Sequence, residues 1–101
     1  MTYRDIFGSP VDLTDERWRH IITQHPEVAV CRERIGEVLA RPTYVKRSRR
    51  AEDVLLYYRH YADLPGGIYL LIVVKIEIRS FVLTSYLVDR IRPGETLWET
   101  S

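Results

Sequence analysis

Apolar residues concentrate in the second half of the chain, in runs at 54–61, 68–77 and 81–88. These runs are rich in β-branched and aromatic side chains, which favour strands. A Pro-Gly-Gly sequence at 65–67 and a short turn before the third run divide them, which predicts hairpin connections. The run at 68–77 is apolar on both faces in its middle, so it is predicted to be the central strand, covered on both sides.

Alternation along the first and third runs predicts which side chains share a face of the sheet, because successive residues of a strand point to opposite sides. In the first run Tyr57 and Arg59 point the same way. In the third run Val82, Thr84 and Tyr86 point the same way. Since these polar side chains lie inside the apolar runs, fold and function are expected to share one sheet.

The first half of the chain has the spacing of helices. Thr14 is a suitable N-cap, and acidic residues follow it in the first turn, where the helix dipole favours them. Apolar residues from Trp18 onward recur at helical spacing and share a face with His25. Pro26 disfavours the helical conformation at the residue before it, so this helix is predicted to end near His25. His20 falls on the opposite side of the helix from Trp18.

The remaining segments complete an α+β pattern, in which helices come before a run of strands. The fold is predicted to be two N-terminal helices packed on one face of a curved antiparallel sheet of four or more strands, in a single domain over 1–101. After residue 89, Pro93-Gly94 interrupts regular structure, and Trp98 is predicted to anchor the tail. The other predicted segments are a hairpin from 2–7 and 11–13, a second helix at 26–41 and a strand at 43–48.

Composition and charge are those of an ordinary globular protein. The chain is 46% apolar and 29% charged, and its formal net charge of +1 gives no global basic signal. The basic residues are nevertheless clustered, because Lys46, Arg47, Arg49 and Arg50 lie close together. A local patch of this kind can bind phosphate even on a near-neutral protein.

The sequence predicts a cytoplasmic protein without a cofactor. Cys31 is the sole cysteine, so no intramolecular disulfide can form, which suits a reducing cytosol. The N-terminal residues lack the apolar segment of a signal peptide, and no apolar run approaches the roughly 20 residues that span a bilayer. The chain has no nucleotide-binding, zinc-binding or nucleophile-elbow motif, and no metal ion is predicted.

The polar residues that remain suit the cleavage of a phosphodiester without a metal ion. Such a reaction needs a base near the 2′-hydroxyl, an acid near the leaving oxygen and cations around the phosphate. Histidine, tyrosine and arginine supply these groups, and a sheet face with aromatic and basic side chains suits RNA. The catalytic candidates are His20, His25, Arg59, Thr84 and Tyr86, and the candidates for substrate binding are Arg47, Arg49, Arg50, Tyr57 and Lys75.

Each candidate also has a purely structural interpretation. His25 shares the apolar face of its helix and can be a core histidine bonded to the backbone. Arg59 can belong to a solvated sheet face, and Thr84 and Tyr86 can serve only as strand formers. The basic cluster at 46–50 can be a solvated loop.

The segments ERWRHIITQHPEV, VLLYYRHY and FVLTSY resemble the phage-associated barnase/EndoU/colicin-tRNase/RelE-like (BECR-fold) small nucleases, and the resemblance covers about residues 13–94. It implies an α+β fold with N-terminal helices on a curved antiparallel sheet. It also implies RNA cleavage without a metal ion, often by a toxin or effector. The matching residues are His20, His25 and Glu27 in the helix motif, Arg59 at a strand position that is often basic, and Thr84 and Tyr86 in the late strand.

Three hypotheses about function follow. The first is a small metal-independent endoribonuclease, such as the toxin of a toxin–antitoxin pair or a phage-type effector, with RNA as substrate and an antitoxin or immunity protein as partner. In it His20 or His25 is the acid or base, Arg59 and the cluster at 47–50 hold phosphate, and Thr84 and Tyr86 orient or hydrogen-bond the scissile group. This hypothesis expects a histidine within hydrogen-bonding reach of one face formed by Arg59, Thr84 and Tyr86. The second is a non-catalytic RNA- or protein-binding module of the same fold, and the third is a structural domain with no site. An exposed sheet edge could also pair two chains into a homodimer.

Overall fold

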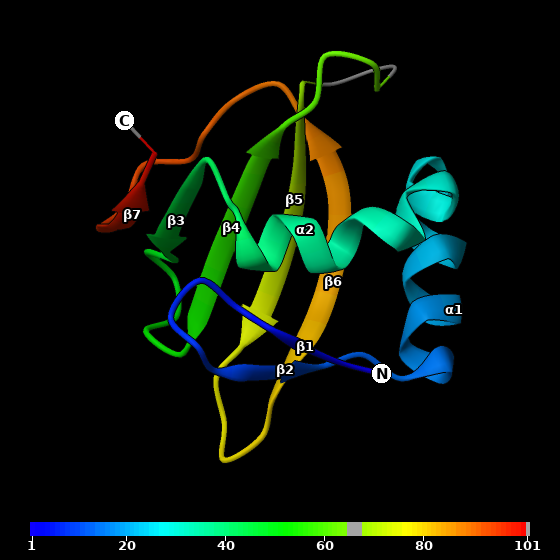
Figure 1. Ribbon diagram of the computed structural model, residues 1–101, viewed down its shortest axis with the longest axis horizontal. Helices are drawn as coiled ribbons and strands as arrows, with labels where there is room; N and C mark the ends of the chain where they lie inside the picture. The colour runs from blue at the N-terminus through cyan, green and yellow to red at the C-terminus, as the bar shows by residue number, and fades with distance from the viewer. Residues whose placement is uncertain (65–67, 101) are drawn as a thin grey trace.

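The computed structural model describes residues 1–64 and 68–100, and it has the α+β architecture expected from the sequence (Figure 1). The Pro-Gly-Gly turn predicted at 65–67 lies outside the described residues. The helices are α1 (Asp15–Gln24), the 3₁₀ helix η1 (Pro26–Arg34) and α2 (Ile35–Ala40). The strands are β1 (Thr2–Arg4), β2 (Pro10–Asp12), β3 (Tyr44–Arg47), β4 (Val54–His60), β5 (Tyr69–Lys75), β6 (Ser80–Val88) and β7 (Thr96–Glu99).

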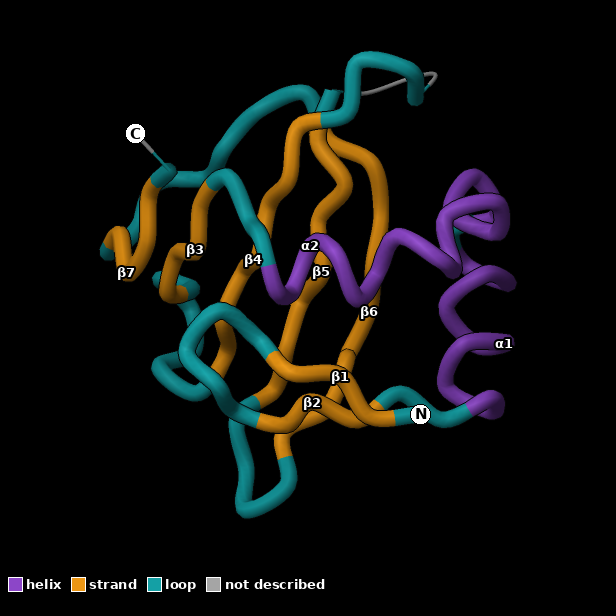
Figure 2. The backbone as a smooth tube through the Cα atoms, viewed as in Figure 1, coloured by secondary structure: helices purple, strands orange, loops and turns teal. Residues whose placement is uncertain are grey.

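The strands form a curled sheet in the order β1-β2-β6-β5-β4-β3-β7 (Figure 2). β5 is the middle strand and is buried from Leu70 to Val74, which confirms the predicted central strand. Among the described residues, neighbouring strands are antiparallel except β2 and β6, which are parallel, with Val11 opposite Ser80. The prediction of an antiparallel sheet is therefore wrong at this pair. Alternation encodes which residues face the core but not the direction of the neighbouring strand, so the sequence pattern could not reveal it.

Helix α1 begins and ends where the sequence predicted. The Thr14 side-chain oxygen accepts a hydrogen bond from the backbone N–H of Arg17 at 3.1 Å, as an N-cap should. Trp18 and Ile21 are buried on its inner face. The helix stops at His25, whose extended backbone lets Pro26 follow.

The second helix differs from the prediction. Residues 26–41 do not form one α-helix, because the first nine of them form η1 and only Ile35–Ala40 form α2. Val28 and Cys31 are buried while Val30 is 80% exposed. A spacing of three residues suits the three-residue turn of a 3₁₀ helix, which places Val28 directly above Cys31. The sequence therefore predicted the buried apolar residues of this segment correctly, but the predicted helix type was wrong for residues 26–34.

The helices occupy two places around the sheet (Figure 1). α2 crosses one face and contacts β4 and β5, whereas α1 stands beside β6 at the side of the sheet. The prediction of helices packed on one face thus describes α2 better than α1. The position of α1 brings its C-terminal end next to β6.

The core has one layer on each side of the sheet. The layer under α2 includes Tyr57, Leu70 and Ile72, each fully buried. The opposite surface, here called the outer face, is built on a second cluster at Leu56, Tyr58, Leu71 and Val73, packed against partly buried neighbours that include Tyr86 and Ile91. Ile91 belongs to the segment between β6 and β7, so this segment covers part of the outer face.

A β-bulge changes the side-chain pattern of β6. Thr84 lies opposite Val73, but Val82 lies opposite Val74, because the register shifts by one residue between these pairs. Thr84 therefore lies on the outer face, together with Tyr86, whereas Val82 packs in the layer under α2. The prediction that Val82 shares the face of Thr84 and Tyr86 is wrong, since strict alternation does not survive a bulge.

A buried carboxylate ties the first hairpin to the sheet. Asp5 is 8% exposed, and its Oδ1 accepts backbone hydrogen bonds from Phe7 at 3.0 Å and Ser9 at 2.8 Å. Its Oδ2 accepts a hydrogen bond from the Tyr57 hydroxyl at 2.5 Å. Burial, and then this carboxylate, raise the pKa of Tyr57 above its usual range. The hairpin predicted at 2–7 and 11–13 is confirmed as β1 and β2, and this contact fixes its position.

β7 was not predicted as a strand. It pairs with β3, with Trp98 opposite Val45, so the tail is anchored mainly by backbone hydrogen bonds. Trp98 itself remains 39% exposed. In the part of the chain that the structure describes, no helix is long and apolar enough to cross a membrane.

Gly94 is expected to be required for stability, because the segment after β6 passes very close to β3. A Cβ atom at Gly94 would lie 2.5 Å from the carbonyl oxygen of Arg47. We expect Gly94→Ala to lower the free energy of unfolding by about 2 kcal/mol, measured by urea denaturation. Gly8→Ala is the control, since Gly8 also has a positive φ of 83° but its Cβ would contact nothing. Equal losses in both variants would mean that the contact with Arg47 is unimportant.

Candidate functional site

The outer face carries a histidine stacked on a tyrosine. The ring of His25, at the end of α1, lies against the ring of Tyr86 on β6, with centroids 4.9 Å apart and planes inclined by 26°. The Nδ1 atom of His25 is 3.8 Å from a carboxylate oxygen of Glu27. The His25 side chain is 31% exposed, so one side of the ring can reach a bound molecule. The arrangement supplies an accessible proton-transfer group with a carboxylate beside it.

Arg92 links this pair to the rest of the outer face. Its Nη2 donates a hydrogen bond to the Tyr86 hydroxyl at 3.0 Å, and its backbone N–H donates to the Tyr58 hydroxyl at 3.2 Å. Burial raises the pKa of Tyr58. The segment after β6 is thereby held across the sheet, which places a guanidinium group next to Tyr86.

Arg92 also lines a cleft of about 280 Å³ with Arg49 and Arg50. The other lining residues come from β4 and from the loops at either side, namely Ser48, Leu56 and Pro93. Among the described residues, no carboxylate forms an ion pair with Arg49, Arg50 or Arg92. The three cations therefore give this cleft, here called the arginine cleft, an uncompensated positive charge.

Thr84 adds an unused polar atom to the outer face. Its Oγ1 is buried and has no hydrogen-bond partner among the described residues. The residue lies two positions before Tyr86 on the same face of β6. A buried hydroxyl without a partner is costly, and a bound group can use this atom only if the neighbouring side chains that cover it shift.

Arg59 lies on the opposite face of the sheet from Thr84 and Tyr86. Its Nε is 3.4 Å from Glu37 of α2, and its Nη1 donates to the carbonyl oxygen of Arg41 at 2.6 Å. The expectation that Arg59 works on one face with Thr84 and Tyr86 is therefore wrong. Alternation placed each residue correctly within its own strand, but it could not show how the two strands are aligned relative to each other.

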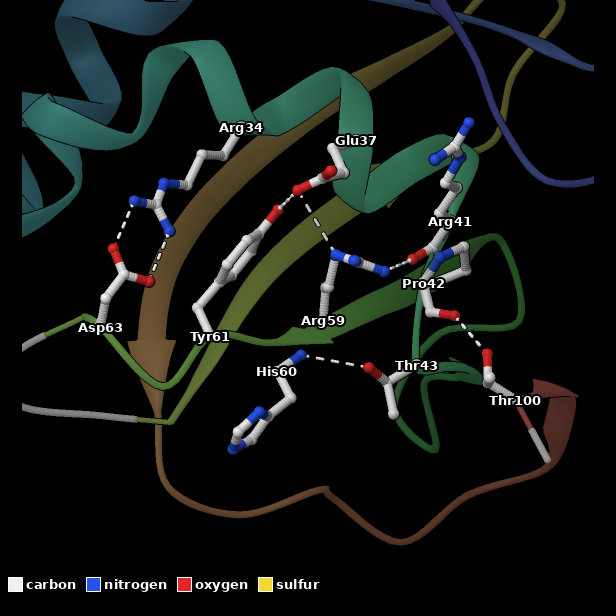
Figure 3. A network of polar contacts seen from close by, with 10 residues as sticks. All are labelled: Arg34, Glu37, Arg41, Pro42, Thr43, Arg59, His60, Tyr61, Asp63 and Thr100. Carbon is white, nitrogen blue, oxygen red and sulfur yellow. Dashed lines mark hydrogen bonds and ion pairs between the residues drawn. The ribbon is translucent and has the colours of Figure 1, made fainter.

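The contacts of Arg59 belong to a group of polar contacts between the helices, the end of β4 and the residues that follow it (Figure 3). Tyr61 donates a hydrogen bond to Glu37, and Arg34 forms two hydrogen bonds with Asp63 at 3.0 and 2.6 Å. The Tyr61 bond and the cations nearby lower the pKa of Glu37, and Arg34 lowers that of Asp63. Burial, and then Glu37, raise the pKa of Tyr61 to about 12. Each charge has a partner, so we interpret the network as structural.

The remaining sequence candidates lie outside the outer-face cluster or are already bonded. Tyr57 is fully buried and bonded to Asp5, which leaves its side chain no access to a substrate. Lys75 is on the outer face but forms an ion pair with Asp53. Arg47 bonds Glu95 at 3.0 Å.

His20 lies on the exposed side of α1. It lines a surface concavity of about 420 Å³ with Thr14, Glu16 and Arg17. Of the two helical histidines, the structure brings only His25 against the late strand.

Sequence reasoning missed Arg92 as a site residue. A signal was present, because Arg92 is a basic residue directly before Pro93-Gly94 and close to the strand that carries Tyr86. The Pro-Gly pair turns the chain back over the sheet, and residues beside such a turn are held near the strand they leave. Arg92 therefore takes the position beside Tyr86 that had been expected of Arg59.

Comparison with known proteins gave no match: no protein-family description, no curated protein and no solved structure is significantly similar to this chain. In residues 1–64 and 68–100, no group of three or more His, Cys, Asp and Glu side chains is placed to hold a metal ion.

Proposed function

We propose that the protein is a small endoribonuclease that cleaves RNA on the outer face without a metal ion. One observation carries the proposal: His25 is stacked on Tyr86 beside Arg92, and Arg92 also lines the arginine cleft. A proton-transfer group, a hydroxyl and several cations that form no ion pair within the described residues therefore lie next to one another. Phosphodiester cleavage by the 2′-hydroxyl needs this set of groups.

The chemistry divides between the residues as follows. A base removes the proton of the 2′-hydroxyl as its oxygen attacks the phosphorus, and an acid protonates the leaving 5′-oxygen as its bond to phosphorus breaks. His25 performs one of these proton transfers, oriented by Glu27. The Tyr86 hydroxyl is the second proton-carrying group at the site, and Arg92 stabilises the charge on the pentacovalent phosphorus. Thr84 supplies a hydrogen bond to the scissile group when the side chains that cover its Oγ1 move aside.

The resemblance to the BECR-fold nucleases supports the same proposal. His25, Glu27, Thr84 and Tyr86 are the matching residues that the fold brings to the outer face. His20 and Arg59 match as well, but they lie elsewhere. In this proposal the protein acts in the cytoplasm as a toxin or phage-type effector, and an antitoxin or immunity protein is its natural inhibitor.

A second candidate function is a non-catalytic RNA- or protein-binding module. The arginine cleft favours it, because Arg49, Arg50 and Arg92 provide charge for an anionic partner but no group that transfers a proton at neutral pH. In that case the protein binds RNA without cutting it, or binds an acidic protein.

Cleavage of total RNA and tRNA in EDTA tests the proposal, and two arginine variants locate the site. We expect the parent protein to cleave in EDTA, and Arg92→Ala to reduce the rate about tenfold or more, because it removes the cation beside Tyr86. Arg59→Ala is the matched comparison, since Arg59 lies on the other face. It should keep the rate when both variants are compared at equal folded fraction, checked by circular dichroism.

No cleavage by the folded parent protein would refute the nuclease and favour the binding module. A larger loss in Arg59→Ala than in Arg92→Ala would move the site to the face under α2.

A further inference from the structure

Aromatic rings cluster on the outer face beyond Tyr86. The ring of His60 on β4 meets that of Tyr69 on β5 at a centroid distance of 5.6 Å. Tyr44 and Tyr58 contact the other sides of Tyr69, at 6.5 and 6.3 Å. His60 is exposed and Tyr69 is half-buried, so part of this surface is open to a planar ligand.

The register of the sheet places this cluster relative to the site. Tyr69 is one strand away from Tyr86 and two residues further along, because Tyr86 pairs with Leu71. Strand geometry puts the Cα atoms of Tyr69 and Tyr86 about 8 Å apart. His60 is four residues along β4 from Leu56 of the arginine cleft, which is about 14 Å. The aromatic rings, the His25–Tyr86 pair and the arginine cleft therefore lie on the same face of the sheet, with Tyr58 buried under the segment of Ile91 and Arg92 between the rings and the cleft.

We propose that this face selects single-stranded RNA, with an unpaired base stacked on the exposed His60 ring beside Tyr69 and a phosphate further along the same strand held in the arginine cleft. The proposal rests on the proposed function, and it adds the substrate class and the residues that select it. None of His60, Tyr69 or Tyr44 takes part in the proposed proton transfers.

The chemistry of the two subsites argues for a single strand. A base can stack on protein aromatic rings only when it has left its own helix, whereas the bases of a duplex stack on each other. Guanidinium groups bind phosphate without regard to sequence. The proposed subsites therefore distinguish single-stranded from duplex RNA but do not select a base sequence.

The charges around the aromatic cluster fit a base better than a phosphate. Glu99 of β7 lies opposite Tyr44 on the same side of the sheet. Its carboxylate repels phosphate there, while the arginine cleft attracts phosphate. The backbone of the strand is thereby directed towards Arg49, Arg50 and Arg92, and its base towards His60 and Tyr69.

Binding of a labelled 2′-O-methyl RNA oligonucleotide, followed by fluorescence anisotropy, tests the inference apart from catalysis. This probe lacks the free 2′-hydroxyl that the proposed cleavage needs, so it is bound without being cut. We expect the single strand to bind more tightly than its duplex. Tyr69→Ala and His60→Ala should each weaken the single strand about tenfold and leave duplex binding unchanged. Arg49→Ala should weaken the binding of both single-stranded and duplex RNA. It should also reduce the slope of log affinity against log salt concentration by about one.

Two controls match these variants. Phe7→Ala removes an exposed aromatic ring in the β1–β2 turn, and Arg19→Ala removes an exposed cation on α1. Neither should change the affinity. Duplex RNA bound as tightly as the single strand, or unchanged affinity in Tyr69→Ala and His60→Ala, would overturn the inference even if the protein cleaves RNA. Absence of binding to either form would overturn it and would favour a protein partner for this surface. Preferential binding of the single-stranded probe by a protein that does not cleave total RNA or tRNA would support the inference. It would refute only the proposed nuclease activity.

Discussion

Replacing His25 by alanine is expected to slow RNA cleavage by about a hundredfold or more, the usual contribution of a general acid or base. The ring stacks on Tyr86, and it is the histidine that the fold brings against the late strand. Loss of the imidazole removes one of the two proton transfers, and the arginine cleft cannot replace it, since guanidinium stays protonated. The measurement is the initial rate of tRNA cleavage in EDTA, with folding checked by circular dichroism.

His20→Ala provides the matched comparison, because His20 belongs to the same helix and lies on its exposed side. We expect the His20 variant to cleave at nearly the parent rate. Glu27→Gln should have an intermediate effect, because the Glu27 carboxylate lies 3.8 Å from the His25 Nδ1 atom and its proposed role is to position the ring rather than to react. A hundredfold loss in His20→Ala, with His25→Ala still active, would assign the proton transfer to His20 and refute the proposed site.

Replacing Asp5 by alanine is expected to destabilise the protein by about 3 kcal/mol. The change leaves the buried Tyr57 hydroxyl and two backbone N–H groups, those of Phe7 and Ser9, without their acceptor. It also removes the side-chain link between the first hairpin and β4, while the pairing of β2 with β6 remains. Urea denaturation would measure the loss as a lower midpoint with an unchanged slope.

Tyr57→Phe separates the two parts of this effect. It removes only the Oδ2 contact of Asp5 and keeps the ring in the core, so we expect a loss of about 1.5 kcal/mol. If Asp5→Ala were as stable as the parent protein, the carboxylate would not hold the hairpin in place.

Local sequence patterns predicted much of the fold. Thr14, Trp18 and Pro26 fixed the limits and the buried face of α1, because caps and helical spacing act within a few residues. The apolar centre of β5 revealed the middle strand. β7 escaped notice because its four residues are mostly exposed and follow a Pro-Gly break.

What the sequence could not show concerns relations between distant segments. The parallel pairing of β2 with β6, and the bulge that moves Val82 to the face under α2, depend on how strands meet in space. The same limit explains the candidate site. His25, Thr84 and Tyr86 were named from their motifs and do come together, but Arg59 was assigned to their face without knowledge of how β4 and β6 align. Arg92 was missed because its role comes from a segment that folds back over the sheet.

The pairing of β2 with β6 has a consequence for how the chain folds. Residues 10–12 and 80–81 must meet, and α1 also packs on the late strand β6, so the sheet cannot be completed until most of the chain is available. Contacts between residues so far apart in the sequence raise the contact order of the fold. Closing the long loop between them costs entropy before the contacts form, so folding is expected to be slow for a chain of this size. During synthesis, residues 1–40 leave the ribosome with their apolar faces uncovered. We therefore expect the nascent chain to be most prone to aggregation before β6 has emerged.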